Sequence, residues 1–422
     1  MNRILLVFFL AIFLFPLHAQ EVTFHKDIAP IIHSKCTPCH KPGGVAPFKL
    51  IEYEDVYKRG KFIAHVTQSR YMPPWHAGPN FGVFKHERKL SPRQVGLIKL
   101  WVQNGMEQGD KSHYQPLGDE SLSNLMKTET ADIVIRMNET YEVPGDLSEQ
   151  YRFFVVPSRL REDTFVSSID FVPGNKRMVH HSRIMTDTTH NMRTMDGLSE
   201  FDPKVNDYRK TPLVDEFFHG WVPGNFRIKF PPGTGKKIYK DTDFIFNIHY
   251  SPTPKPEWDR SEIRLYRTTE KVEREVGTLA LDEKYITNQP FEIPPGEVST
   301  FYMKSPFVTH DLSVIGVLPH MHLLGKSFKA YAITPEGDLV KLIHIPSWDF
   351  NWQNTYQYKN LVKIPKGSVI YAEAVFDNRA ENPQNPFFPP KLVKNGWNTT
   401  DEMMNLILYY VPYREGDEEL EY

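Results

Sequence analysis

Both cysteines of the 422-residue chain lie in one short motif, Cys36-Thr37-Pro38-Cys39-His40. C-x-x-C-H is the pattern of c-type haem attachment: each thiol bonds a vinyl group of the haem, and the histidine ligates the iron. A redox disulfide between Cys36 and Cys39 would be expected beside a βαβ pattern, which the sequence lacks, and zinc would need two further ligands in a compact module. The motif therefore predicts one covalent haem c with His40 as an iron ligand.

Histidine recurs at the ends of three other apolar runs, and methionine follows in a fourth segment. The segments are Met178–His181, Asn247–Tyr250, Pro319–His322 and Thr400–Asn405. Imidazole suits copper, zinc, iron and nickel, whereas a thioether selects soft metal ions, above all Cu(I). Because the haem motif uses both cysteines, thiolate ligands are excluded here. The pattern predicts metal sites built from histidine and methionine.

Strand geometry decides which of these histidines can share an ion. Residues two apart on a strand face the same side, so His320 and His322 can bind one ion together. His180 and His181 are neighbours and point apart on a regular strand, so a shared ion requires a β-bulge or a strand end there. The alternative is that these histidines cap sheets by hydrogen bonding, the usual role of a lone histidine in a β-protein.

The segments around the haem motif have helical patterns. Ile28, Ile31 and Ile32 have helical spacing directly before Cys36. Ser91-Pro92-Arg93-Gln94 has the pattern of an N-cap, an N1 proline and a capping-box glutamine, and Asn104-Gly105 ends the helix. The residues of the apolar face between these ends are Val95, Ile98, Trp101 and Val102. Two helices crossing beside a haem are typical of a small cytochrome c.

From Val22 to Asp110 the chain resembles a bacterial type of cytochrome c. The stretches that carry the resemblance are Asp27–Ile31, Cys36–His40, Gly43–Phe48, Met72–Trp75 and the helix end Trp101–Asp110. A methionine as the second iron ligand raises the haem potential relative to two histidines. We expect Met72, because the prolines after it can hold its loop rigid. The other candidates are Met106, His65 and His76.

The N-terminus has the pattern of a secretory signal peptide. Met1-Asn2-Arg3 precedes an uncharged run of 14 residues, Ile4–Leu17, and a small residue, Ala19, stands at the expected cut. The run is shorter than the roughly 20 residues that span a bilayer, although an uncleaved membrane anchor is the alternative. We expect cleavage after Ala19, export to the periplasm or the medium of a bacterium, and no stable membrane span afterwards.

Composition limits the remaining possibilities. Lys+Arg is 50 and Asp+Glu is 52, a net charge of −2 that argues against a nucleic-acid partner. The 34 prolines disfavour long helices and suit short strands joined by turns. Beyond a polar linker, short β-type runs alternate with Pro-Gly turns, which predicts sandwiches or jelly rolls. The runs are Ile133–Ile135, Tyr151–Val156, Phe244–Tyr250, Val314–Leu318, Ser368–Phe376 and Leu406–Tyr410.

The β-rich part is too long for one sandwich, so we place a boundary near Leu279. The expected parts are a signal peptide at 1–19, a cytochrome c domain at 20–112, a linker at 113–130, and jelly rolls at 131–278 and 279–422. The predicted fold class is multidomain: a small all-α cytochrome c domain followed by two all-β jelly-roll sandwich domains.

From about Asp132 to Tyr410 the chain resembles the copper type II ascorbate-dependent monooxygenases, which include the peptidylglycine α-hydroxylating and dopamine β-hydroxylating enzymes. The resemblance is carried by the histidine segments and by Asp401-Glu402-Met403 followed by Asn405-Leu406. It implies two packed jelly rolls with one copper each. The implied ligands are His180, His181 and His249 for the electron-accepting copper, and His320, His322 and Met403 for the catalytic copper, with Met404 as the rival of Met403.

Several features depart from the animal enzymes of this family. This chain cannot form their several disulfides. The peptide-amidating enzymes have an arginine two residues before the H-x-H pair, where Leu318 stands here, and a tyrosine four residues after the ligand methionine, where Ile407 stands. These changes argue against a peptide ending in glycine and favour a less polar substrate.

The resemblance implies that one copper stores an electron while the other binds O2 and hydroxylates a C–H bond of a small organic substrate. Our hypothesis is that the haem is a built-in donor that passes electrons to the copper held by His180, His181 and His249. An external redox protein or an ascorbate-like reductant would supply the electrons. Two alternatives are a periplasmic haem and copper electron-transfer protein without oxygenase activity, and a binding module whose histidines are structural.

Overall fold

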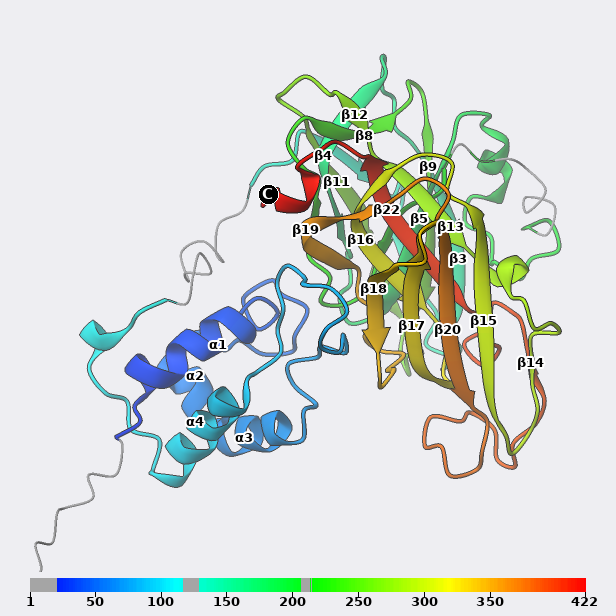
Figure 1. Ribbon diagram of the computed structural model, residues 1–422. Coiled ribbons are helices and arrows are strands. Elements are labelled where there is room, and N and C mark those ends of the chain that lie inside the picture. The colour runs from blue at the N-terminus through cyan, green and yellow to red at the C-terminus, as the bar shows by residue number, and fades with distance from the viewer. Residues whose placement is uncertain (1–20, 117–128, 206–212, 214) are drawn as a thin grey trace, which may run out of the picture. The chain divides into compact units, whose positions relative to one another are not determined.

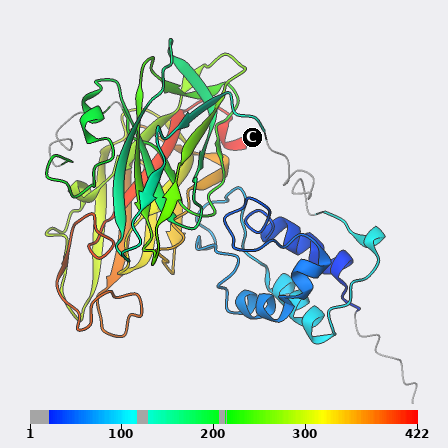
Figure 2. The ribbon, with the colours of Figure 1, turned by 180° about the vertical axis from the view of Figure 1, so that it is seen from behind.

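A computed structural model describes residues 21–116, 129–205, 213 and 215–422 (Figures 1 and 2). The expected signal peptide and most of the expected linker lie outside these residues. None of the helices described is long and apolar enough to cross a membrane. The chain divides into two compact units. The helical unit comprises residues up to Pro73 together with Arg88–Lys127, and the β unit comprises Pro74–Glu87 together with Thr128–Tyr422.

The helical unit is built from short helices around an apolar core. Its elements are η1 (Phe24–Ile28), α1 (Ala29–Lys35), α2 (Tyr53–Tyr57), α3 (Gly60–Gln68), α4 (Pro92–Gln103) and η2 (Lys111–His113). The predicted start of α4 is confirmed, because the Ser91 side chain accepts the Gln94 N–H at 3.2 Å and the Gln94 side chain accepts the Ser91 N–H at 2.8 Å. Trp101 of α4 is fully buried, so this helix supplies the centre of the core.

The first sandwich of the β unit consists of two sheets. Their orders are β1-β11-β4-β8-β12, with β7 beside β4, and β3-β9-β5-β6. The strands are β1 (Ile133–Arg136), β3 (Gln150–Pro157), β4 (Thr164–Val172), β5 (Val179–Asp187), β6 (Asp215–Trp221), β7 (Ile228–Lys229), β8 (Thr234–Ile238), β9 (Asp243–Tyr250), β11 (Glu262–Arg267) and β12 (Arg274–Glu275). Phe171 of β4 contacts Phe246 of β9, with ring centroids 6.1 Å apart, so the two sheets share one core.

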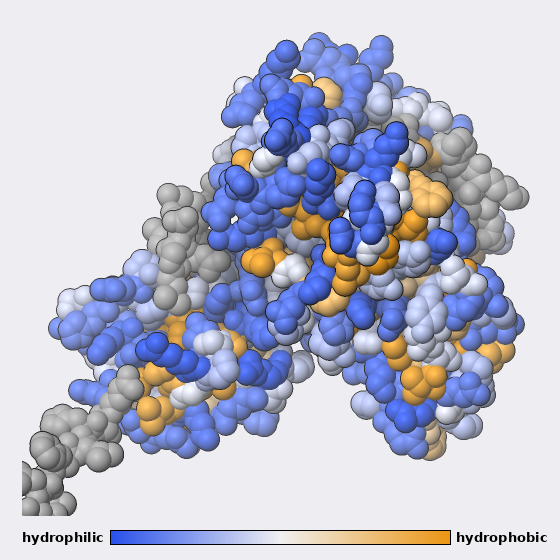
Figure 3. Space-filling view, in the orientation of Figure 1, coloured by the Kyte–Doolittle hydropathy of each residue, from blue (hydrophilic) through white to orange (hydrophobic). Residues whose placement is uncertain are grey.

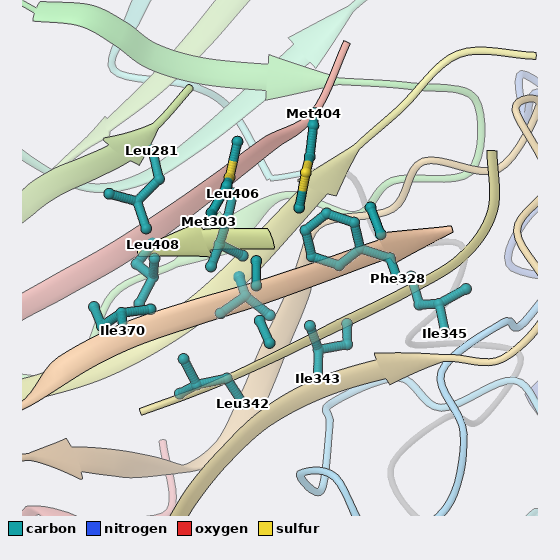
Figure 4. Packing of buried hydrophobic residues seen from close by; sticks show 14 of the residues in the cluster. Leu281, Met303, Phe328, Leu342, Ile343, Ile345, Ile370, Met404, Leu406 and Leu408 are labelled. Atoms are coloured by element: carbon teal, nitrogen blue, oxygen red, sulfur yellow. The ribbon is translucent and has the colours of Figure 1, made fainter. Parts of the chain in front are cut away.

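The second sandwich has sheets of order β13-β22-β16-β19 and β15-β20-β17-β18. Its strands are β13 (Gly277–Leu281), β15 (Val298–Phe307), β16 (Leu312–His320), β17 (Gly325–Ile333), β18 (Leu339–Ile345), β19 (Tyr356–Ile364), β20 (Val369–Asp377) and β22 (Asn405–Pro412). Figure 4 shows how apolar side chains of both sheets fill the core between them. Two short pairs complete the unit: β2 (Tyr141–Val143) with β10 (Glu257–Asp259), and β14 (Glu292–Ile293) with β21 (Val393–Lys394).

The prediction of a mostly β fold is confirmed for the part of the chain beyond residue 130. All six β-type runs singled out in the sequence lie in strands, namely β1, β3, β9, β16, β20 and β22, except for Ser368, which directly precedes β20. The first sandwich ends with β12 at Glu275, and the second begins with β13 at Gly277. Figure 3 shows mostly hydrophilic side chains on the visible face, with hydrophobic ones in small groups, as expected when the apolar residues fill interior cores.

One segment that was expected in the cytochrome c domain at 20–112 packs instead as part of the β unit. Residues 74–87, called the strap from here on, follow α3 in the chain. The Lys85 N–H donates to the Gln357 carbonyl and the Lys359 N–H to the Val83 carbonyl, both at 2.8 Å. The strap therefore extends the sheet at the edge strand β19. Phe84 is only 6% exposed and belongs to the core of the second sandwich.

Candidate metal centres

A β-bulge brings together the three histidines of the first sandwich. Strands β5 and β9 pair antiparallel with Val179 opposite Tyr250 and His181 opposite His249, so His180 is an extra residue on β5. This is the irregularity that a shared ion requires at neighbouring histidines. One ring nitrogen each of His180, His181 and His249 lie within 4.8 Å of one another. We call these three residues the first cluster.

The environment of the first cluster suits a metal ion bound by neutral imidazoles. Burial lowers the pKa of His180 to about 4 and that of His181 well below its usual value, which leaves lone pairs available at neutral pH. His249 is 2% exposed, yet neither of its ring nitrogens makes a hydrogen bond to any residue described. Buried polar atoms normally have a partner, and a metal ion bound here would be the partner that His249 lacks.

Glu149 and Tyr151 support His249 from the side. The Tyr151 ring stacks on the His249 ring with centroids 4.1 Å apart, and the Tyr151 hydroxyl donates to Glu149 Oε2 at 3.1 Å. Burial of Glu149 raises its pKa, but the His249 ring and the hydroxyls of Thr399 and Tyr151 outweigh this and hold the pKa at about 2. An ionised carboxylate therefore lies beside the cluster, with Glu149 Oε2 3.7 Å from His249 Nε2.

His320 and His322 come together in the second sandwich, although not on one regular strand as expected. Strand β16 ends at His320, and His322 follows in the loop beyond it. The two ring centroids are nevertheless 5.0 Å apart. The side chain between them, Met321, is fully buried in the apolar core, so the histidines still share the other side.

Hydrogen bonds orient both of these imidazoles. His320 Nδ1 bonds the side-chain oxygen of Gln353, and His322 Nδ1 lies 3.1 Å from the Asp401 carbonyl. Because both partners accept, each Nδ1 carries the proton and each Nε2 keeps its lone pair for a metal ion. Burial lowers the pKa of His320 to about 4 and that of His322 to about 3, so both rings are neutral at pH 7.

The two neighbouring methionines before β22 have different surroundings. Met403 lines a cavity together with His320 and His322. Met404 is fully buried and lies in the apolar core, as Figure 4 shows. The thioether available to the two histidines is therefore that of Met403. We call His320, His322 and Met403 the second cluster.

Glu402 joins the two segments of the second cluster, a role that the sequence pattern does not indicate. Its side chain is fully buried and accepts the N–H groups of His322 at 2.9 Å and Leu324 at 2.6 Å. Burial raises the pKa of Glu402 to about 8. The residue fixes the loop after β16 against the segment that carries Met403.

Replacing Glu402 with alanine should loosen the second cluster. Two buried N–H groups would lose their acceptor, at a cost of about 1–3 kcal/mol for each group. We expect lower stability in chemical denaturation and, in calorimetric titration, weaker copper binding at the second cluster, with the first cluster unchanged. Glu402→Gln keeps one acceptor oxygen and should have a smaller effect. Equal loss of affinity at both clusters would contradict this role.

The two clusters are close to one cavity of about 340 Å3. The ring centroids of His181 and His320, one from each sandwich, are 6.4 Å apart. A cavity of this size is at the lower end of those that hold small organic ligands. Side chains that line it include His181, His320, His322, Met403, Tyr151, Arg183, Glu200, Phe217, Trp221, Leu318, Trp397 and Ile407. Leu318 and Ile407, the two departures noted in the sequence, thus both face this space.

The C-x-x-C-H motif of the helical unit begins where α1 ends. Cys36 caps α1, and Cys36 and Cys39 are unpaired. Burial raises the pKa of the Cys36 thiol to about 12. His40 Nδ1 lies 2.9 Å from the Phe48 carbonyl, so Nδ1 carries the proton and Nε2 is left for an iron. A Cβ at Gly44 would lie 2.1 Å from the Cys39 carbonyl oxygen, so the loop that follows the motif requires glycine there.

The four candidates for the second iron ligand lie in different surroundings. Met106 packs against the core of the helical unit, with Sδ 2.4 Å from where a Cβ of Gly60 would stand. His65 is exposed, and His76 Nδ1 lies 3.0 Å from the Ser347 carbonyl of the β unit. Met72 is half-buried near the end of the first of the two segments that make up the helical unit, where its N–H donates to the Val66 carbonyl at 3.0 Å.

Comparison with known proteins relates the second sandwich to a family of copper enzymes. The C-terminal domain of the copper type II ascorbate-dependent monooxygenases matches residues 275–420, which contain the whole second cluster. A human protein named DBH-like monooxygenase protein 2 is 26% identical over 214 residues, which cover 47% of this chain and 41% of that protein. The chain thus matches less than half the length of this relative.

Likeness to solved structures is weak. The major capsid protein P2 of bacteriophage PM2 aligns over 67% of this chain and 98% of its own, with 8% identity and a TM-score of 0.23. The VP2 subviral particle of infectious bursal disease virus aligns over 69% of this chain and 74% of its own, with 12% identity and a TM-score of 0.17. Scores this low carry no conclusion about this chain.

Proposed function

We propose that this protein is an exported copper-dependent monooxygenase that hydroxylates a C–H bond of a small organic substrate with O2, and that a covalent haem c is its built-in electron donor. The observation that carries the proposal is that His181 of the first cluster and all three residues of the second cluster line one cavity. His181 and His320 come from different sandwiches, and their ring centroids are 6.4 Å apart. The match to the monooxygenase family covers the second cluster and gives independent support.

Each cluster has the ligand chemistry that copper of this kind needs. Copper, when bound, supplies O2 activation and one-electron storage. The first cluster offers three imidazoles and no soft ligand. The second cluster offers two imidazoles and the Met403 thioether, which favours Cu(I). Gln353 and Asp401 hold the rings of His320 and His322 in the tautomer that directs Nε2 to the ion.

The cavity wall favours a substrate with an apolar part. Leu318, Ile407, Phe217 and Trp221 all line the space beside the second cluster. Contact with such side chains removes the apolar surface of a substrate from water, which favours its binding. Leu318 and Ile407 offer no group to pair with a carboxylate at the two positions where the peptide-amidating enzymes have arginine and tyrosine, although Arg183 lines the same cavity. The substrate class we propose is a small, weakly polar organic molecule.

The helical unit would hold the haem through Cys36 and Cys39, with His40 and Met72 as iron ligands. The free thiols and the orientation of the His40 ring support this arrangement. Covalent attachment of such a haem takes place outside the cytoplasm, in agreement with the expected signal peptide. The electrons would pass from the haem to the copper of the first cluster. An external redox protein or an ascorbate-like reductant would then reduce the haem again.

The test measures oxygen uptake by the copper- and haem-loaded protein with a panel of small apolar substrates. Mass spectrometry of the product formed under 18O2 should then detect one 18O atom. A His320→Ala/His322→Ala variant is the matched control and should form no product. Redox activity of both metals without substrate-dependent uptake of oxygen would favour the electron-transfer alternative. Absence of stoichiometric copper would favour the binding module.

A further inference from the structure

The strap leads from the Met72 loop into the second sandwich. Trp75 follows Met72 by three residues, and its ring meets the Tyr356 ring edge-on with centroids 5.2 Å apart. Tyr356 is almost fully buried at the start of β19. Three residues before it in the chain is Gln353, whose side-chain oxygen bonds Nδ1 of His320. Met72 is therefore connected to His320 in four steps. Covalent bonds lead from Met72 to Trp75, a ring contact leads to Tyr356, covalent bonds lead to Gln353, and a hydrogen bond leads to His320.

Several contacts hold Trp75 in this place. Phe84 contacts both Trp75 and Tyr356, with ring centroids 6.3 and 5.3 Å apart. The Gly78 N–H donates to the His344 carbonyl at 2.7 Å. Together with the pairing of the strap along β19, these contacts fix the segment at several points. The Trp75–Tyr356 contact is thus part of the packed core of the second sandwich and needs no further contact from the helical unit.

We propose that the strap is the electron entry path of the β unit, with Trp75, Tyr356 and Gln353 providing the coupling between the Met72 loop and His320. This proposal rests on the proposed function. In the step, one electron leaves a ferrous haem, which becomes ferric, and reduces one cupric ion to cuprous; no bond is made or broken. Since the His181 ring lies 6.4 Å from the His320 ring, an electron that reaches His320 has only a short distance left to the first cluster.

The test uses the full-length protein with ferric haem and Cu(II), kept anaerobic. A photoreductant delivers less than one electron per chain, and reoxidation of the haem is followed by its absorbance. We expect a fast phase whose rate is independent of protein concentration, and loss of this phase in Trp75→Leu. Trp75→Phe keeps an aromatic ring and should therefore show much of the fast phase of haem reoxidation. A merely structural role of Trp75 would not make this rate depend on an aromatic ring. The matched control is Trp258→Leu, at an exposed tryptophan on β10, in the short strand pair β2–β10 of the β unit.

Copper and haem contents are measured first, so failure of the two proposals can be told apart. Unmodified protein without covalent haem or without copper would overturn the proposed function before any kinetics. If Trp75→Leu keeps both groups and reoxidises as fast as unmodified protein, the strap proposal is wrong and the proposed function stands. If Trp75→Leu does not fold, Trp75→Met provides an apolar side chain without a ring, and the same outcomes apply to it.

Discussion

Replacing Met403 with histidine should leave copper bound at the second cluster but reduce hydroxylation by roughly 100-fold or more, since even changes beside metal ligands cost about 10- to 100-fold. The new imidazole would replace one ligand with another. It would also remove the soft donor of the cluster, so that Cu(II) is favoured over the Cu(I) form that meets O2. Copper content and initial rates of product formation measure the two effects separately.

The neighbouring methionine provides the matched control. Met404 lies in the core of the second sandwich, where leucine has nearly the same volume and costs less than about 1.5 kcal/mol. Met404→Leu should therefore keep most of the activity. The reverse pattern, an inactive Met404→Leu and an active Met403→His, would mean that the ligand is Met404.

Replacing both Cys36 and Cys39 with serine should abolish covalent haem, because these are the two cysteines of the chain. Copper binding should persist, because the residues of both clusters belong to the β unit. Haem staining after denaturing electrophoresis and copper analysis of the purified protein measure the two results. Serine removes the sulfur with little change in size, so loss of haem reports on the chemistry of attachment.

Haem that stays covalently attached in the double variant would contradict the assignment of the motif. Loss of copper along with haem would contradict the independence of the two units. Single variants add a further check, since one remaining thiol allows one thioether bond at most.

Local patterns in the sequence were sufficient for most elements. The capping box at Ser91 and the β-type runs depend on neighbouring residues, and the structure confirms them. The bulge at His180 could be named as a requirement of shared metal binding, but its form depends on the register between β5 and β9. The end of β16 at His320 was not foreseen, because alternation alone does not say where a strand stops.

Contacts between distant residues could not be predicted in this way. The apolar residues of the strap are separated by glycine and proline without a period, and their partners on β19 follow more than 270 residues later. Glu402 belongs to the segment that carries the family resemblance, but its hydrogen-bonding role could not be predicted, because its partners are backbone N–H groups about 80 residues away that leave no side-chain pattern. The approach of His181 to His320 likewise depends on how the two sandwiches pack.

Copper stoichiometry tests the central claim, two copper sites at one cavity, most directly. We expect two copper ions per chain in the unmodified protein by elemental analysis after dialysis. We expect one copper ion in His180→Ala/His181→Ala and one in His320→Ala/His322→Ala, each with an unchanged circular dichroism spectrum. Two copper ions retained in either folded variant, or a single ion in the unmodified protein, would contradict this claim.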